Sequence, residues 1–206
     1  MIFPLSKAKV RLVRTIYEKP NIKVSELLKQ ARISQKAAYK YLKELLDSRI
    51  ISEILEGKKP TLRLFTPRFS EAGKACFALL EEEKKLDFFD KHKDLKGQFI
   101  HFEDEVRSFV DVALIFGSFA RGAETKSSDI DLLIVSENRE KKKIEKALER
   151  CFVTAKQTVS VRRIEQKKIV EMLKRKEEFA LQILRDHIVV LNSHNWIEIL
   201  QQASEI

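Results

Sequence analysis

The stretch from residue 111 to residue 135 constrains the fold more than any other part of the sequence. Val112–Phe116 is an uninterrupted apolar run that ends at a Gly-Ser pair, and from residue 130 to residue 134 every second residue is apolar. A short continuous apolar run bounded by a turn signal predicts a buried strand, and apolar residues at every second position predict a second strand. The sequence therefore predicts a sheet in which a glycine–serine turn follows one strand and acidic residues open the next.

The chemistry of this stretch depends on Asp129 and Asp131. Residues two apart in a strand point to the same side, so both carboxylates face one point. Two like charges held that close resist joint ionisation unless a cation offsets them, and Mg²⁺ accepts carboxylate oxygens while leaving room for substrate phosphates. Gly117 and Ser118 supply backbone N–H donors at the start of a short helix, and Arg121 adds a forked contact for a phosphate oxygen.

The spacing resembles that of a known superfamily. Gly-Ser, ten residues and then Asp-x-Asp between two apolar strands is similar to the signature of polymerase-β-like nucleotidyltransferases, and the fuller string resembles their minimal, kanamycin-nucleotidyltransferase-like branch, which is common in prokaryotic regulatory and toxin–antitoxin pairs. The resemblance covers about residues 98–192. It implies a short mixed sheet that binds a nucleoside triphosphate with Mg²⁺, and in-line attack of an acceptor hydroxyl on the α-phosphorus. Carried over, it assigns nucleotide binding to Gly117, Ser118, Arg121 and Ser128, and metal binding and catalysis to Asp129 and Asp131. A purely structural role, in which the aspartates only cap a strand, is the alternative.

The sequence departs from the family pattern at one position. Active members have a third carboxylate on a later strand, and here the matching strand is 157–163, with Ser160 where the acid is expected. Glu165 is the nearest downstream carboxylate that would reach in, and Asp111 lies at the start of the first strand, away from the cluster. This departure leaves one metal site well supported and a second one without its acid.

The positive charge is concentrated in the first third of the chain. The formal net charge is +9, and residues 1–70 hold 16 Lys or Arg against 6 Asp or Glu. Such a segment attracts a polyanion and gains affinity by releasing counterions. A lysine-rich surface that keeps a heat-adapted protein soluble is the alternative.

Residues 1–67 show a pattern of three short helices followed by a hairpin. Helical patterns cover about 6–17, 24–31 and 34–48, and two β-prone stretches at 50–55 and 61–66 flank a polar link with Gly and Pro. This order resembles a winged helix-turn-helix, whose third helix enters the major groove of duplex DNA. On that resemblance, DNA would be contacted by Gln35, Lys36, Tyr39, Lys40 and Lys43 of the third helix and by Lys58 and Lys59 of the wing. A solvated lysine face and a protein–protein module are the alternatives.

The expected fold is therefore an α/β nucleotidyltransferase domain with a mixed sheet, at 98–206, preceded by a winged helix-turn-helix domain at 1–67. Residues 68–97 are expected to form a helical connector or dimerisation helix, with a linker at His92–Gly97. No apolar run has the length of a membrane helix, and Cys76 and Cys151 match no metal-ligand or redox spacing. We expect a cytoplasmic protein without disulfides, and a homodimer is compatible with this pattern.

Three functions are compatible with these patterns. The first is an Mg²⁺-dependent enzyme that transfers a nucleoside monophosphate to a protein, RNA or small-molecule acceptor. The second is a DNA-binding regulator that senses nucleotide, or contacts a partner protein, without turnover. The third is an antitoxin-like protein of a two-gene system. Ser160 distinguishes the first two, because loss of the third acid weakens catalysis but leaves triphosphate binding intact.

Overall fold

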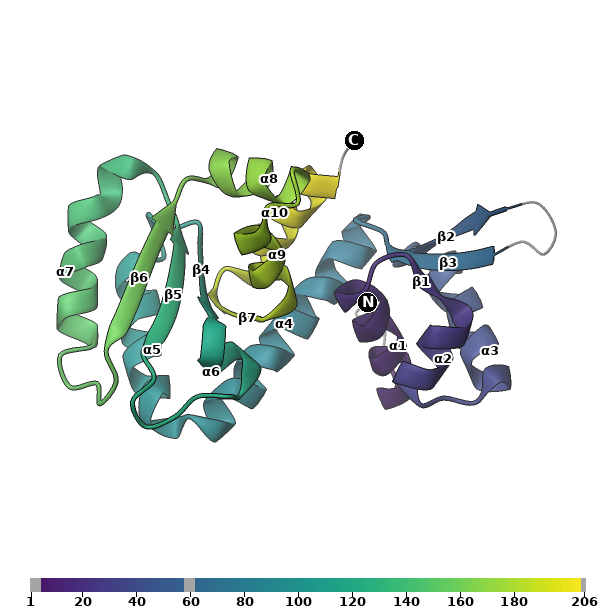
Figure 1. Ribbon diagram of the computed structural model, residues 1–206, viewed down its shortest axis with the longest axis horizontal. Coiled ribbons are helices and arrows are strands. Elements are labelled where there is room, and N and C mark those ends of the chain that lie inside the picture. The colour runs from purple at the N-terminus through teal and green to yellow at the C-terminus, as the bar shows by residue number, and fades with distance from the viewer. Residues whose placement is uncertain (1–4, 58–61, 205–206) are drawn as a thin grey trace. The chain divides into compact units, whose positions relative to one another are not determined.

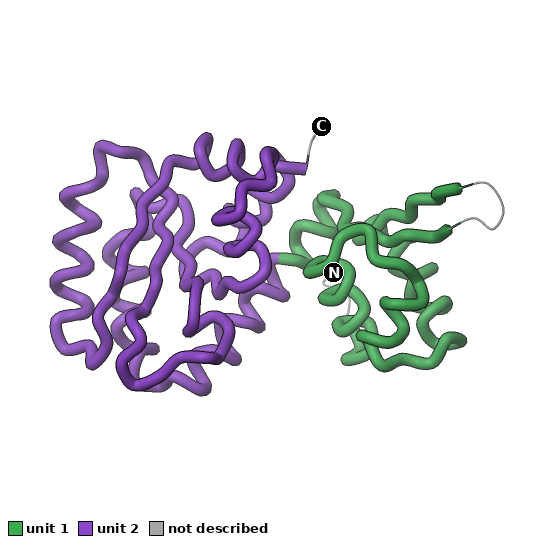
Figure 2. Tube along the Cα trace, in the orientation of Figure 1, with its two compact units in different colours: residues 1–77 green, residues 78–206 purple. Residues whose placement is uncertain are grey.

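The computed structural model of the protein describes residues 5–57 and 62–204, and Figure 1 shows their helices and strands. Lys58 and Lys59, which were expected on the wing, lie outside the described residues. The chain divides into two compact units, Met1–Phe77 and Ala78–Ile206, coloured separately in Figure 2. Within the described ranges, none of the helices has both the length and the hydropathy needed to span a membrane.

The first unit contains the three helices and the hairpin that the sequence predicts. Its sheet has the strand order β1-β3-β2, and all its pairs are antiparallel. The hydroxyls of Ser6 and Ser34 each accept a hydrogen bond from a backbone N–H in the first turn of a helix, so both serines are N-caps. The elements are α1 (Lys7–Glu18), β1 (Ile22–Lys23), α2 (Val24–Ala31), α3 (Gln35–Asp47), β2 (Ile51–Glu56) and β3 (Leu62–Pro67).

The apolar faces of these elements form the core of the first unit. Tyr17 on α1 stacks on Phe77 with ring centroids 4.9 Å apart, and Phe69 meets Phe77 edge-on at 5.7 Å. Aromatic pairs in these arrangements stabilise a core beyond their buried area. The buried set includes Leu12, Val13, Ile16, Leu27, Ala38, Leu42, Leu45, Ile51 and Phe65.

The connector expected at 68–97 consists of helix rather than helix and linker. Helix α4 (Glu71–Lys91) is followed after one residue by α5 (Lys93–Val106), so the predicted linker at His92–Gly97 is wrong. The reason is packing: α5 buries Leu95, Phe99, Phe102 and Val106 along one face, which outweighs the low helix propensity of Gly97.

The second unit is built on a mixed sheet, as the sequence resemblance implies, and the sheet has four strands in the order β6-β5-β4-β7 (Figure 1). Strand β4 pairs antiparallel with both β5 and β7, whereas β5 and β6 are parallel. Its elements after α5 are β4 (Val112–Phe116), α6 (Gly117–Arg121), β5 (Ile130–Val135), the 3₁₀ helix η1 (Asn138–Glu140), α7 (Lys141–Cys151), β6 (Val159–Ile164), α8 (Gln166–Lys174), α9 (Glu178–Arg185), β7 (His187–Leu191) and α10 (Ser193–Ser204).

The two faces of this sheet have different roles. One face packs against α5 and α7 through a continuous apolar cluster, which includes Ala113, Ile115, Ile130, Leu132, Ile134, Ile188 and Val190. Because side chains alternate along a strand, Phe116 and Asp131 lie on the other face. Phe179 of α9 meets Phe116 edge-on there, with ring centroids 5.7 Å apart. Trp196 of α10 is fully buried and packs inside this unit.

A buried ionic network joins α4 to β7 and α10 inside the second unit. Glu81 is fully buried, and its Oε1 lies 3.1 Å from His187 Nε2 while its Oε2 lies 2.9 Å from Lys84 Nζ. His187 Nδ1 lies 2.8 Å from the carbonyl of Ile183, and Trp196 Nε1 lies 3.2 Å from His187 Nε2. Because the indole N–H can only donate, His187 Nε2 accepts from Trp196 when the ring is neutral and donates to Glu81 when it is protonated.

This network sets the ionisation of Glu81. Burial is the largest single influence on Glu81 and opposes its charge, but His187 and Lys84 together outweigh it, and the pKa falls from its usual 4.5 to about 2. A depressed pKa of this kind contributes stability above the unfolded-state pKa. That contribution is lost as the pH falls from about 4.5 towards about 2.

Replacement of Glu81 should therefore destabilise the second unit strongly. We expect Glu81→Ala to lower its free energy of unfolding by about 3–5 kcal/mol, because the buried His187 and the partly buried Lys84 lose their carboxylate partner. Urea unfolding followed by the fluorescence of Trp196, the single tryptophan of the chain, measures this unit specifically.

Asp87→Ala is the matched control, since Asp87 is an exposed carboxylate on the same helix and its loss should change stability by less than about 0.5 kcal/mol. Wild-type stability should also fall between pH 4.5 and pH 2 more steeply than that of Glu81→Gln. Equal pH profiles for the two proteins would contradict the assignment.

Candidate functional site

The candidate site is centred on the end of β4 and the start of β5, which the antiparallel pairing of the two strands brings together. Phe116 is the Cα partner of Asp131, so the turn that follows β4 lies against the start of β5. Gly117 has φ +74°, a conformation that favours glycine, and a Cβ built on it would overlap the carboxylate of Asp131. The glycine therefore allows the backbone of the turn to approach this carboxylate closely.

Helix α6 and the loop after it carry the chain from the turn to Asp129. Phe119 is buried and anchors the helix in the core, and Gly122 ends it with φ +65°. In the loop, the hydroxyl of Ser128 accepts a hydrogen bond from the backbone N–H of Thr125 at 2.9 Å. Ser128 thus orders the loop before Asp129, and the nucleotide contact expected of it stays a prediction.

The charges of three sequence-predicted residues converge here. Burial and the nearby charge of Asp129 raise the pKa of Asp131, and the charge of Arg121 partly opposes them. Arg121 Nη1 also lies 3.8 Å from Asp186 Oδ2, at the end of α9. Sequence reasoning missed Asp186, because only the pairing of β7 with β4 brings residue 186 to this end of the sheet.

Strand β6 adds Ser160 to the site. Asp131 and Ser160 are Cα partners in the parallel β5–β6 ladder, so the serine lies directly beside Asp131. Glu165 follows the far end of β6 and accepts a hydrogen bond from Asn138, so it does not reach the aspartates. Asp111 precedes β4 at that same far end, as expected.

A second positively charged side chain, that of Arg162, lies on β6 close to Ser160. Arg162 is two residues beyond Ser160 on the same face, and its guanidinium carbon lies 3.9 Å from the centroid of the Phe179 ring. Such cation–π contacts fix the direction of a guanidinium. Strand alternation could have indicated the orientation of Arg162, whereas its partner Phe179 follows only from the packing of α9.

The carboxylates of the site fit one divalent cation that is bound jointly by the protein and by a substrate phosphate. In residues 5–57 and 62–204 there is no group of three or more His, Cys, Asp or Glu that could hold a metal by itself. Asp129 and Asp131 supply two hard oxygen ligands. Burial and then the negative charge of Asp129 raise the pKa of Asp131, and a bound cation would offset that charge. Mg²⁺ commonly binds through one or two carboxylates plus substrate phosphates, so these residues fit that ion.

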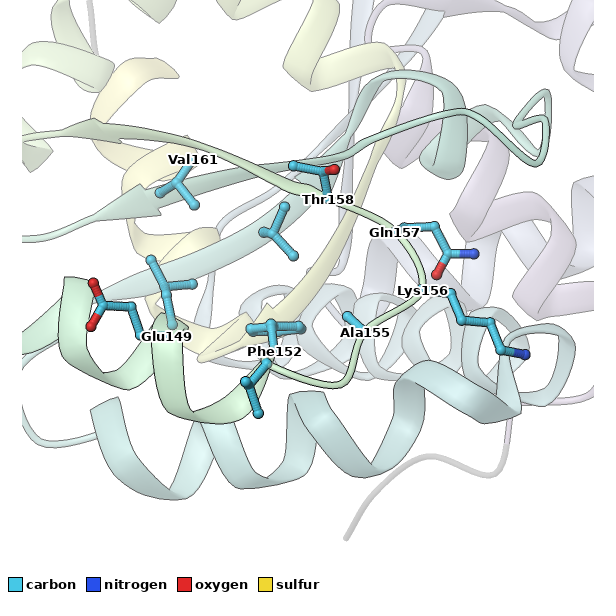
Figure 3. Close-up of a pocket in the computed structure, with 10 residues that line it drawn as sticks. Glu149, Phe152, Ala155, Lys156, Gln157, Thr158 and Val161 are labelled. Carbon is cyan, nitrogen blue, oxygen red and sulfur yellow. The ribbon is translucent and has the colours of Figure 1, made fainter.

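An open pocket of about 430 Å³ lies beside the same sheet, between the end of α7 and the start of β6 (Figure 3). Leu148, Phe152, Val159 and Val161 supply its apolar lining, and Lys156 and Gln157 are among its polar residues. Its ten lining residues include none of the residues that the sequence predicts for nucleotide or metal binding. The pocket is therefore separate from the candidate site.

In the first unit, α3 presents the predicted recognition face to solvent. The five residues of α3 that are expected to contact DNA are all exposed, whereas Ala38, Leu42 and Leu45 of the same helix are buried. Arg63 of β3 lies over the ring of Tyr39 at 5.7 Å and is paired with Glu53, an addition that the sequence did not indicate. The exposed residues are Gln35, Lys36, Tyr39, Lys40 and Lys43.

A comparison with known families matches the part of the chain that contains this site. Residues 98–195, which contain the whole four-stranded sheet, match the family described as Polymerase beta, Nucleotidyltransferase. The match supports a polymerase-β-like nucleotidyltransferase domain in this part of the chain and a nucleotidyltransferase type of function. No curated protein is similar enough to the chain to count as a match.

Three glycine variants test the close approach of the turn to Asp131. Gly117→Ala should lower the stability of the second unit by more than the roughly 1–2 kcal/mol of a left-handed backbone, because the new methyl group also displaces the Asp131 carboxylate. Gly122→Ala should cost only the backbone strain, since no atom lies within 4 Å of its Cβ position. Urea unfolding followed by Trp196 fluorescence compares them.

Gly97→Ala is the second control. Gly97 lies inside α5 with open space at its Cβ position, so alanine should stabilise the unit by about 0.5–1 kcal/mol. A Gly117→Ala cost no larger than that of Gly122→Ala would contradict the contact with Asp131.

Proposed function

We propose that the second unit transfers a nucleoside monophosphate from a nucleoside triphosphate to an acceptor hydroxyl, with Mg²⁺ as cofactor. The proposal is carried by one observation: two strand-spaced carboxylates, Asp129 and Asp131, interact electrostatically at the point where the Gly117 turn approaches β5. The family match over residues 98–195 supports the same class of reaction.

Each residue of the site has a role in this proposal. Backbone N–H groups of the Gly117–Ser118 turn bind triphosphate oxygens, and Arg121, held near Asp186, adds positive charge to them. Asp129 and Asp131 hold the metal, which when bound would supply charge neutralisation at the phosphates. The acceptor oxygen attacks the α-phosphorus in line, and pyrophosphate leaves.

Ligand-dependent stability tests the metal assignment. Mg²⁺ with a nucleoside triphosphate at about 100 times Kd should stabilise the wild-type unit by about 2.7 kcal/mol and raise its Tm. Asp129→Asn/Asp131→Asn should abolish that rise, because the site then lacks both charged ligands. Differential scanning fluorimetry measures the shift.

Asp111→Asn is the control for charge removal alone, since Asp111 lies at the opposite end of β4. It should leave the ligand-induced shift intact. A shift that survives in the double aspartate variant would remove the metal assignment.

We further propose that residues 1–67 form a winged helix-turn-helix that binds duplex DNA. The order of three helices and a hairpin, the charge of the first 70 residues and the exposed α3 face support it. Phosphate contacts dominate such binding and position the protein without reading base sequence.

Salt dependence tests the DNA proposal. Affinity for duplex DNA should fall steeply with salt, and Lys36→Ala/Lys40→Ala should reduce the slope by about one unit for each phosphate that the variant no longer neutralises. Fluorescence anisotropy over a salt series measures it. Lys141→Ala/Lys142→Ala removes the same charge from exposed positions on α7 and should leave the slope unchanged. A flat salt dependence in the wild type would favour a protein partner instead.

The second candidate function is a nucleotide-binding regulator or antitoxin-like protein without turnover. Ser160 favours it, because a serine hydroxyl next to Asp131 carries no charge with which to bind a second metal. Incubation with labelled nucleoside triphosphates and cell lysate separates the two candidates. Label transferred to any macromolecule supports the enzyme, and triphosphate binding without transfer supports the regulator.

A further inference from the structure

We propose that Ser160 is itself an acceptor, so that the protein attaches a nucleoside monophosphate to its own Ser160 hydroxyl. This inference rests on the proposed nucleotidyl transfer and adds its first acceptor. It assigns a covalent modification site to β6 and explains why a hydroxyl, rather than a charged ligand, stands beside Asp131.

The first support is the position of the hydroxyl. Ser160 and Asp131 are directly paired in the β5–β6 ladder, and neighbouring strands lie about 4.8 Å apart. Paired residues in a ladder point to the same face, so the Ser160 side chain projects beside the carboxylate of Asp131. Ser160 is exposed, whereas Val159 and Val161 on the opposite face pack against the apolar core.

The second support is that the site has few charged side chains with which to bind and activate an acceptor from solution. Among the described residues, Asp129 and Asp131 have no third His, Cys, Asp or Glu close enough to complete a metal-binding group. A diffusing hydroxyl would have to be bound, oriented and activated by the same two carboxylates that face the nucleotide. Ser160 needs no binding step, and a reacting group already held in place gains up to about 7–11 kcal/mol of barrier reduction from proximity.

The third support is the cation beside the serine. Arg162 lies two residues further along the same face of β6, which is about 6.6 Å along a strand. Its guanidinium is held on the Phe179 ring, and the residue is exposed to solvent. The phosphodiester formed on Ser160 carries one negative charge, and a fixed guanidinium can stabilise it through forked hydrogen bonds.

The step is balanced with the nucleoside triphosphate as the only co-reactant. The Ser160 Oγ forms a bond to the α-phosphorus while the bond from that phosphorus to the bridging oxygen of pyrophosphate breaks. The electron pair leaves with pyrophosphate, and the hydroxyl proton passes to solvent. The product is a serine nucleoside-5′-phosphate ester, and one pyrophosphate is released for each modified chain.

Intact-mass spectrometry of the full chain, incubated with Mg²⁺ and each of the four nucleoside triphosphates, tests the proposal. We expect the mass to rise by one nucleoside monophosphate per chain, and peptide mapping to place it on Ser160. Ser160→Ala should lose the added mass, and Ser160→Thr should retain it, because threonine keeps the hydroxyl and suits a strand.

Thr158→Val is the matched control, since Thr158 is the nearest residue before Ser160 that also carries a hydroxyl. It should keep the added mass. A label that maps to another residue, or that survives in Ser160→Ala, overturns the proposal.

Thermal shift with Mg²⁺ and triphosphate separates this inference from the proposed function. Ser160→Ala should bind triphosphate like the wild type, because Ser160 contributes no charge to the site. Wild-type protein that binds triphosphate and labels lysate, but never itself, would overturn the Ser160 assignment and leave the transferase proposal standing. Protein that neither binds triphosphate nor labels anything would overturn both.

Discussion

The pairing of Phe116 with Asp131 is the constraint on which the candidate site depends. This register brings the end of β4 and the start of β5 together, so that the Gly117 turn and the Asp131 carboxylate come into close approach. A shift of one residue would turn Asp131 towards the apolar face that packs on α5 and α7. The buried alternation of Ile130, Leu132 and Ile134 prevents that shift, so the packing of the core fixes the direction of the chemical groups.

The remaining elements of the second unit stabilise the ends of β4 and β5 at which the candidate site lies. Phe119 anchors α6 in the core, and Asp186 holds Arg121 near Asp131. The buried network of Glu81, Lys84 and His187 fastens α4 to β7, the strand that pairs with β4 next to the site. Burial of a charged carboxylate is costly unless its partners are retained, so this network couples the stability of α4 to the integrity of the sheet.

Strand β6 decides what the site can do with a bound triphosphate. Its outward residues are Ser160 and Arg162, a hydroxyl and a cation, next to a pair of carboxylates on β5. This arrangement keeps the groups that we propose to hold a nucleotide and its metal, and it places a hydroxyl of the chain itself beside them. The two proposals for this protein, a transferase that first modifies itself and a regulator that only binds nucleotide, therefore differ in whether the Ser160 hydroxyl reacts.

The sequence by itself determined the strands, the glycine–serine turn, the paired aspartates and the serine at residue 160, because strand periodicity and short-range spacing are local properties of the chain. It also predicted the helical pattern and the exposed basic face of α3. It failed at His92–Gly97, where the burial of Leu95 and Phe99 converts an expected linker into α5. Only the tertiary structure brought Asp186 to Arg121, Phe179 to Arg162 and Glu81 to His187. These contacts join residues far apart in sequence, and their geometry follows from strand order and helix packing, which no local pattern encodes.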